Sequence, residues 1–272
     1  MESVSLENLS RRMIGGAAGE GGMNNRYGNL AARVYQLDKP VGRSFGDIEL
    51  YRDLLAGISG PILEPAVGNG RMLVPLLESG LEVHGFDTSP EMLAYCESAC
   101  RARGLTANLS QQSFSDFMFD RTFSAVIVPA GSIQLVTDIK EAIAVLRRFH
   151  DALEEGGRLI LDLDSIRWLS APAGAMRHWE DGDDMLTLQE ERLETDFANQ
   201  TTTSLLRYEH WSNGKLVNTE IETFALRLWG IWEMELALCA AGFQSSKVHA
   251  SYKCDGVITP DSEMFTFEAL KG

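Results

Sequence analysis

The chain has 272 residues, of which 44% are hydrophobic and 23% are charged, a balance that is typical of a globular protein with a sizeable core. The formal net charge of -15 repels nucleic-acid phosphates and anionic membrane surfaces, so neither is expected as a partner. No apolar run approaches the ~20 residues of a membrane-spanning helix and no signal-peptide pattern opens the chain, so we expect a cytoplasmic monomer or homodimer whose partner is a small molecule.

The N-terminal segment, residues 1–45, is predicted to be a lid. Residues 1 to about 25 are rich in glycine, which keeps a chain flexible until something orders it. A pattern that predicts a helix begins at Tyr27 and ends at Lys39-Pro40. One interpretation is a segment that closes over a ligand and pairs its carboxylate with an Arg or Lys. The alternative is a solvated helix whose tyrosines pack on the core.

Strand and helix patterns alternate strictly from residue 46 to residue 165. Short apolar runs predict strands at 61–64, 81–86, 107–111, 123–128 and 158–163. Alternation with short turns indicates a parallel sheet with helices on both faces. Residues 229–272 add a helix and two more strands, so we expect an α/β fold with a Rossmann-like core and a mostly parallel seven-stranded sheet.

The four cysteines contain no C-x-x-C pair. Cys96 and Cys100 lie one turn apart on a predicted helix, where they fit as small packing residues. This spacing is not that of a zinc or redox site. We therefore expect reduced thiols and no metal.

Residues 166–228 change in character and predict an antiparallel β insertion. Two strand-like runs flank Asn213-Gly214, a pair that is typical of a tight hairpin turn. Tryptophans gather in and after this segment. They either wall a substrate pocket or build a small core for the hairpins.

A glycine-containing turn, Glu64-Pro65-Ala66-Val67-Gly68-Asn69-Gly70, follows the first strand and opens a helix. Glycines let the backbone approach a ligand closely, and a helix N-terminus presents free N–H groups. Leu73 stands where the dinucleotide fingerprint needs its third glycine, so a nicotinamide cofactor fits poorly. Asp87 ends the second strand, where a carboxylate accepts hydrogen bonds from ribose hydroxyls. The other interpretation of Asp87 is a turn residue ahead of Ser89-Pro90.

The sequence resembles the class I S-adenosylmethionine-dependent methyltransferases over about residues 27–164 and again over 233–243. It is most similar to bacterial small-molecule enzymes that carry an Asp-Lys-Pro segment before the core, here residues 38–40, and Gln-Gln-Ser text after the third strand, here 111–113. The resemblance implies S-adenosyl-L-methionine as the cofactor. It implies cofactor-binding roles for Glu64, Ala66, Gly68, Asn69, Gly70, Asp87, Thr88, Met92, Gln112, Ser113, Phe114, Pro129 and Ala130. Tyr27 and Arg43, in the predicted lid, are further candidates for cofactor binding.

Two residues depart from the family pattern. Ala66 replaces a glycine, which makes a positive φ at this position more costly. Ser113 replaces an adenine-binding aspartate, so the bond to the exocyclic amine is weaker or comes from Gln112.

Candidates for substrate binding are Ser132, Trp168, Trp179, Arg207 and Trp211. A general base is needed only if the substrate atom arrives protonated. The candidates are Tyr35, His178 and His210, although most lone histidines have no catalytic role.

The expected activity is direct displacement, in which a substrate atom attacks the sulfonium methyl in line. Two alternatives remain open. The chain could attack another carbon of the cofactor, by ring closure such as azetidine-carboxylate formation or by aminocarboxypropyl transfer, and release methylthioadenosine. It could also be a non-catalytic module that senses the cofactor.

Overall fold

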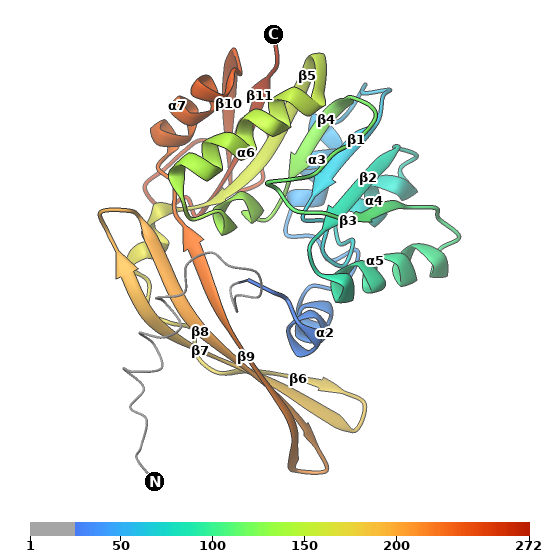
Figure 1. Cartoon of the computed structure of the whole chain (residues 1–272), viewed down its shortest axis with the longest axis vertical. Helices are drawn as coiled ribbons and strands as arrows, with labels where there is room; N and C mark the ends of the chain where they lie inside the picture. Colours follow the sequence, from blue (N-terminus) through green and yellow to red (C-terminus); the bar gives the residue numbers. More distant parts are fainter. Residues whose placement is uncertain (1–24) are drawn as a thin grey trace.

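The computed structural model describes residues 25–272 as two sheets joined by helices (Figure 1). The larger sheet has seven strands in the order β10-β11-β5-β4-β1-β2-β3. Its strands are β1 (Ile62–Pro65), β2 (Val83–Asp87), β3 (Asn108–Gln111), β4 (Phe123–Val128), β5 (Leu153–Asp164), β10 (Ser245–Ala250) and β11 (Met264–Leu270). β1 to β5 pair in parallel, and β11 runs antiparallel to both of its neighbours. The expected Rossmann-like α/β fold is confirmed.

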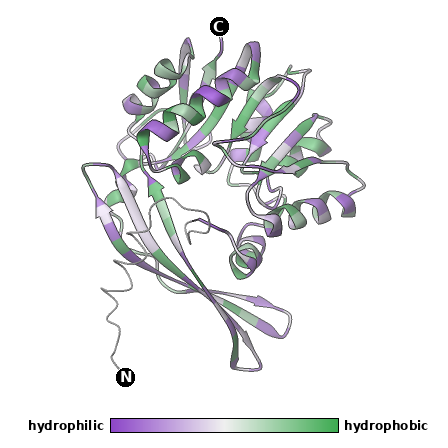
Figure 2. Cartoon of the chain, viewed as in Figure 1, coloured by the Kyte–Doolittle hydropathy of each residue, from purple (hydrophilic) through white to green (hydrophobic). Residues whose placement is uncertain are grey.

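Helices cover both faces of this sheet, and alternation along β4 shows why. Val126 and Val128 pack toward α6 (Ile139–Ala152) and α7 (Ile231–Ala241). Ala125 and Ile127 pack on the other face, with α3 (Asp47–Leu54), α4 (Leu73–Glu78) and α5 (Pro90–Ala102). The strands are accordingly the most hydrophobic part of the core in Figure 2. No helix within residues 25–272 is long and apolar enough to cross a membrane.

The cysteines take no part in disulfides. All four are free, and Cys96 and Cys100 lie on the buried face of α5, in agreement with the expected packing role.

The smaller sheet is antiparallel and extends away from the core (Figure 1). Its strands are β6 (Arg177–Asp181), β7 (Asp184–Asp196), β8 (Thr201–Ser212) and β9 (Lys215–Arg227). The turn between β8 and β9 places Asn213 at φ 50° and Gly214 at φ 72°, the backbone that an Asn-Gly hairpin turn requires. A short 3₁₀ helix, η2 (Ile166–Ser170), connects the core to this sheet.

Helix α2 (Asn29–Asp38) lies against the smaller sheet. Leu30, Ala31 and Val34 share an apolar cluster with residues of β7 and β8. At the β6–β7 turn, Arg33 forms ion pairs of 2.6 Å with Asp181 and 3.2 Å with Asp184. The part of the expected lid that the structure describes is thus docked on the sheet, and residues 1–24 lie outside the described residues.

A buried ion pair ties the segment after α2 to the glycine-containing turn. Arg71 lies 2.5 Å from Asp47, and both side chains are at least 95% buried. Arg71 also donates to the carbonyl of Arg43, while the Asn69 amide donates to Gln36 and to the carbonyl of Lys39. These contacts fix the chain that crosses the turn.

A second buried acid, Asp162 on β5, holds the turn that follows β4. One of its oxygens accepts hydrogen bonds from the Ala130 N–H (2.8 Å) and the Tyr252 hydroxyl (3.2 Å), and the other accepts from Thr266 (2.7 Å). Ala130 has φ 56°, a left-handed conformation that is unusual for a residue with a side chain. Burial raises the pKa of Asp162 to about 7.

Removing one partner of a buried ion pair leaves an uncompensated charge. We therefore expect Asp47→Ala to lower the free energy of unfolding by about 3–5 kcal/mol in urea titrations. The exposed Asp53→Ala on the same helix is the control and should change it by less than about 0.5 kcal/mol. Equal effects of the two variants would show that the pair has no structural role.

Asp162 predicts a pH-dependent stability. Its folded pKa, about 7, lies above the unfolded value of about 4. The folded state therefore holds a proton that the unfolded state has lost between these pH values, so the stability that Asp162 contributes falls as pH rises from 4 to 7. Asn cannot ionise, so Asp162→Asn should not share this loss. As pH rises, the free energy of unfolding of the wild type should fall relative to that of Asp162→Asn by up to about 1.4 kcal/mol per pH unit. Denaturant titrations across this range that give a constant difference would contradict it.

Candidate functional site

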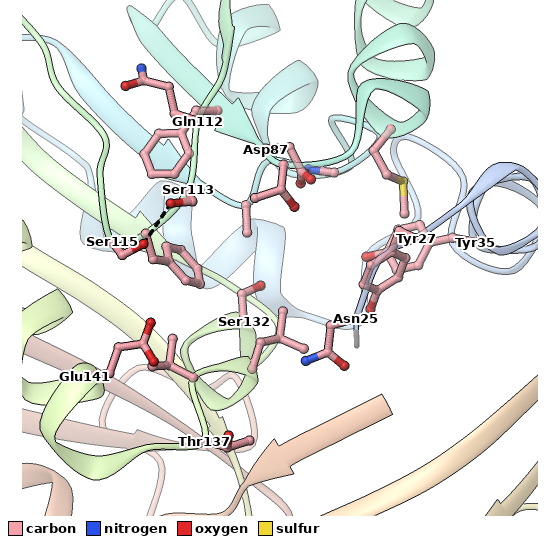
Figure 3. Close-up of a pocket in the computed structure, with 18 residues that line it drawn as sticks. Asn25, Tyr27, Tyr35, Asp87, Gln112, Ser113, Ser115, Ser132, Thr137 and Glu141 are labelled. Atoms are coloured by element: carbon pink, nitrogen blue, oxygen red, sulfur yellow. Dashed lines mark hydrogen bonds between the residues drawn. The ribbon is translucent and has the colours of Figure 1, made fainter. Parts of the chain in front are cut away.

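A cavity of about 340 Å³ opens at the carboxyl ends of β1, β2 and β4, where ligands bind in open α/β sheets. In Figure 3, Tyr27 and Tyr35 lie at one end, Gln112 and Ser113 at the other, and Asp87 between them. Nine of the predicted cofactor-binding residues line it: Tyr27, Ala66, Gly68, Asp87, Thr88, Met92, Gln112, Ser113 and Phe114. We call this space the first cavity.

The turn after β1 forms one wall of the first cavity. Ala66 (φ 54°), Gly68 (φ 56°) and Gly70 (φ 83°) all have left-handed backbone. Ala66 therefore adopts a positive φ, a conformation that is costly for a residue with a side chain. A Cβ on Gly68 would meet nothing within 4 Å, whereas one on Gly70 would lie 2.6 Å from the Cys96 sulfur. Gly68 thus leaves backbone open to a ligand, and Gly70 allows α5 to pack close to the turn.

Asp87 is held rigidly at the centre of the first cavity. Its Oδ2 accepts the Gly68 N–H and its Oδ1 the Ser89 N–H, both at 2.9 Å. Burial raises the pKa of Asp87, and these backbone hydrogen bonds oppose the rise. Each carboxylate oxygen keeps a further lone pair, so the side chain can accept two more hydrogen bonds from adjacent hydroxyl groups.

The far end of the first cavity combines apolar and polar groups. Phe114 packs edge-on against Phe86, with ring centroids 6.3 Å apart, and provides a flat apolar wall. The side chain of Gln112 already forms two hydrogen bonds: its oxygen accepts the Met118 N–H, and its NH₂ group donates to the Ser110 hydroxyl. The Ser113 hydroxyl donates to Asp116 at 2.5 Å. Ser115, which the sequence analysis did not single out, also lines this end.

The other predicted cofactor-binding residues lie behind or beside this wall. Asn69 and Gly70 are buried in the turn, and Arg43 is exposed and donates to the Asp38 carbonyl. Glu64 is 1% exposed, and its Oε2 has no hydrogen-bond partner among the described residues. Burial raises its pKa well above the ordinary value. Pro129 and Ala130 form the turn after β4, next to the cavity residue Ser132.

A second cavity, of about 360 Å³, lies between α2, η2 and the smaller sheet. Tyr27 and Tyr35 line both cavities, and their rings meet edge to face at 5.9 Å. Burial raises the pKa of both hydroxyls, which therefore stay protonated at neutral pH. A molecule in either cavity would touch the same two rings.

The predicted substrate and catalytic residues are divided between these spaces and the surface. Ser132 lines the first cavity, Trp168 the second, and Tyr35 both. The other five line neither: Trp179 packs near α2, Arg207 pairs with Glu209, Trp211 donates to Thr187, His210 pairs with Asp184 and His178 is exposed. Asp164, which the sequence analysis passed over, lines the second cavity at the end of β5.

Among the described residues, one group has metal-ligand chemistry: His249, Cys254 and Asp255, whose ligand atoms lie within 4.8 Å of one another. His249 Nδ1 already accepts the Asp255 N–H, and the Asp255 carboxylate pairs with Lys247 at 2.5 Å. The group lies outside both cavities.

The chain is similar in sequence to known methyltransferases. Residues 62–157 match the family model of a methyltransferase domain. Over 215 residues the chain is 26% identical to the putative methyltransferase YqeM of Bacillus subtilis (strain 168), which covers 78% of this chain and 84% of the relative.

Two solved structures are similar in fold. A S-adenosylmethionine-dependent methyltransferase from Clostridium acetobutylicum ATCC 824 matches with a TM-score of 0.74 at 18% identity, over 89% of this chain and 97% of that one. The sugar N-methyltransferase KedS8 from Streptoalloteichus sp ATCC 53650 matches with a TM-score of 0.71 at 22% identity, over 94% and 97%. The chain therefore contains a methyltransferase domain over residues 62–157 and has the fold of S-adenosylmethionine-dependent methyltransferases.

Proposed function

We propose that this enzyme methylates a small molecule by direct displacement, with the cofactor in the first cavity and the acceptor in the second. The observation that carries the proposal is that the two cavities meet at Tyr27 and Tyr35. Methyl transfer needs two molecules whose reacting atoms approach at about 3–3.5 Å. Two adjoining spaces with one shared wall satisfy that need.

The residues of the first cavity suit the cofactor. Asp87 would accept the ribose hydroxyls, and Phe114 and Met92 would border the adenine. Gly68, which has open space where a side chain would be, would let the backbone meet the methionine part. Bound there, S-adenosylmethionine supplies a methyl group on a positively charged sulfur. The chain orients the acceptor and excludes water around it.

The second cavity also favours methyl transfer over ring closure, because an enzyme that only cyclises its cofactor has no use for an acceptor site. KedS8, a sugar N-methyltransferase, supports a small-molecule acceptor. Within this proposal residues 46–165 and 229–272 hold the cofactor, the segment 1–45 is a lid over it, and residues 166–228 select the acceptor. A net charge of -15 supports an acceptor other than nucleic acid or a membrane lipid. We also propose that the enzyme acts in the cytoplasm as a monomer or homodimer.

Asp87→Ala should weaken S-adenosylhomocysteine binding by tenfold or more in calorimetry. Charge-assisted hydrogen bonds to the ribose contribute about 1.5–3 kcal/mol, and they are lost with the carboxylate. Asp120→Ala removes an exposed carboxylate elsewhere on the core and should leave the affinity unchanged. If both variants bind like the wild type, the first cavity does not hold the ribose.

The by-product identifies the bond that breaks. We expect protein, methyl-deuterated S-adenosylmethionine and a bacterial metabolite extract to give S-adenosylhomocysteine together with a deuteromethylated metabolite. Mass spectrometry measures both, and an incubation without extract is the control. Methylthioadenosine above the spontaneous background, formed without extract, would instead establish an intramolecular cyclase.

A further inference from the structure

We propose that Asp164 recognises the acceptor as an amine: its carboxylate binds the ammonium group in the second cavity and accepts a proton from it. This inference rests on the proposed methyl transfer and names the chemical class of its acceptor. The acceptor would be an amphipathic amine, because much of the cavity wall is apolar, including Val34, Leu188, Leu206 and Phe224.

The position of Asp164 places it where the two cavities meet. It is the last residue of β5 and lines the second cavity. A Cβ added to Gly131 would lie 3.2 Å from its Oδ2, so the carboxylate lies against the backbone next to Ser132. Ser132 in turn lines the first cavity. A group bound to Asp164 would therefore lie at the border with the cofactor.

The backbone of Asp164 is fixed by Gln134, a fully buried residue of the 3₁₀ helix η1 (Ser132–Leu135). The side-chain oxygen of Gln134 accepts a hydrogen bond from the backbone N–H of Asp164 at 2.9 Å. The side-chain NH₂ of Gln134 donates to the backbone carbonyl of Asp164 at 3.3 Å. Because both bonds use the backbone, they hold the residue in place and leave the carboxylate free.

The carboxylate of Asp164 has no partner of its own among the described residues. It accepts no hydrogen bond and forms no ion pair there. The other acids of this cavity are engaged: Asp38 pairs with Arg177 at 3.3 Å, and Glu190 accepts the Ser204 hydroxyl at 2.7 Å and lies 3.8 Å from Arg192. Asp164 is thus the open acid of the second cavity.

The remaining cation of the cavity, Lys39, faces Asp164 without pairing with it. Its ammonium lies over the Tyr35 ring, 5.3 Å from the centroid. Burial lowers the pKa of Lys39 and raises that of Asp164, and the attraction between the two opposite charges opposes both shifts without cancelling them. An ammonium from an acceptor would supply the charge that Asp164 lacks.

Amine chemistry makes use of this arrangement. The ammonium gives one proton to Asp164 and becomes a neutral amine. Its nitrogen lone pair then forms a bond to the methyl carbon, and the carbon–sulfur pair returns to sulfur. Positive charge moves from sulfur to nitrogen, and an N–H of the new ammonium donates a hydrogen bond to the carbonyl oxygen of the protonated Asp164. The product leaves as an N-methylammonium ion, and Asp164 returns its proton to water.

A matched pair of probes tests recognition without turnover. We expect 2-phenylethylamine to bind the S-adenosylhomocysteine complex at least tenfold more tightly than 2-phenylethanol, as measured by NMR titration at pH 7. Asp164→Asn preserves the shape and the backbone bonds to Gln134, and it should abolish the preference. Asp183→Asn removes an exposed carboxylate at the β6–β7 turn and should retain it. Equal binding of the two probes, or a preference that survives Asp164→Asn, overturns the inference.

A second arm separates this inference from the proposed function. The metabolite extract is treated with N-hydroxysuccinimidyl acetate, which acylates amines and leaves alcohols intact. Loss of deuteromethyl transfer after treatment supports an amine acceptor. Transfer that persists overturns it while the methyltransferase proposal stands. Methylthioadenosine formed without extract contradicts methyl transfer itself, and the probe titration still decides whether Asp164 binds a cation.

Discussion

The carboxyl ends of the parallel strands all meet at one edge of the larger sheet, and the site depends on this constraint. Parallel pairing of β1 with β2 and β4, and of β4 with β5, brings together residues far apart in the sequence. Asp87 ends β2 and Asp164 ends β5. The turns that follow β1 and β4 lie between Asp87 and Asp164 along this edge. A cofactor and an acceptor can therefore lie side by side over a scaffold that is buried on both faces.

This edge is built from strained turns and from the acids that hold them, of which Asp162 is fully buried and Asp87 partly buried. Ala66 and Ala130 both have positive φ, which costs roughly 1 kcal/mol or more for residues with a side chain. Asp87 holds the first turn through the Gly68 N–H, and Asp162 holds the second through the Ala130 N–H. Burial raises the pKa of both acids, so holding these turns costs free energy when the acids ionise. Such strain is a feature of preorganised sites.

Local patterns in the sequence predicted much of this arrangement. Apolar alternation predicted the core strands. The turn after β1 and the acid at the end of β2 were predicted to bind a ligand, and both line the first cavity. Boundaries were less accurate: β5 was expected at 158–163 and begins at Leu153, where its pairing with β4 is shifted by a bulge. Trp179 and Arg207 were candidates because of their residue type, but strand register places them away from both cavities. Asp162 and Asp164 occupy similar positions in the sequence. Only long-range packing makes Asp162 a buried acid that holds a turn and Asp164 a carboxylate that faces a cavity.

We propose that the two cavities hold the cofactor and its acceptor on either side of Tyr27 and Tyr35. A crystal structure of the S-adenosylhomocysteine complex tests it most directly. We expect the ribose hydroxyls within hydrogen-bond distance of the Asp87 carboxylate, and the sulfur at the border of the second cavity, near Ser132 and the two tyrosines. A ribose bound away from Asp87, or a sulfur closed off from the second cavity, would contradict the account.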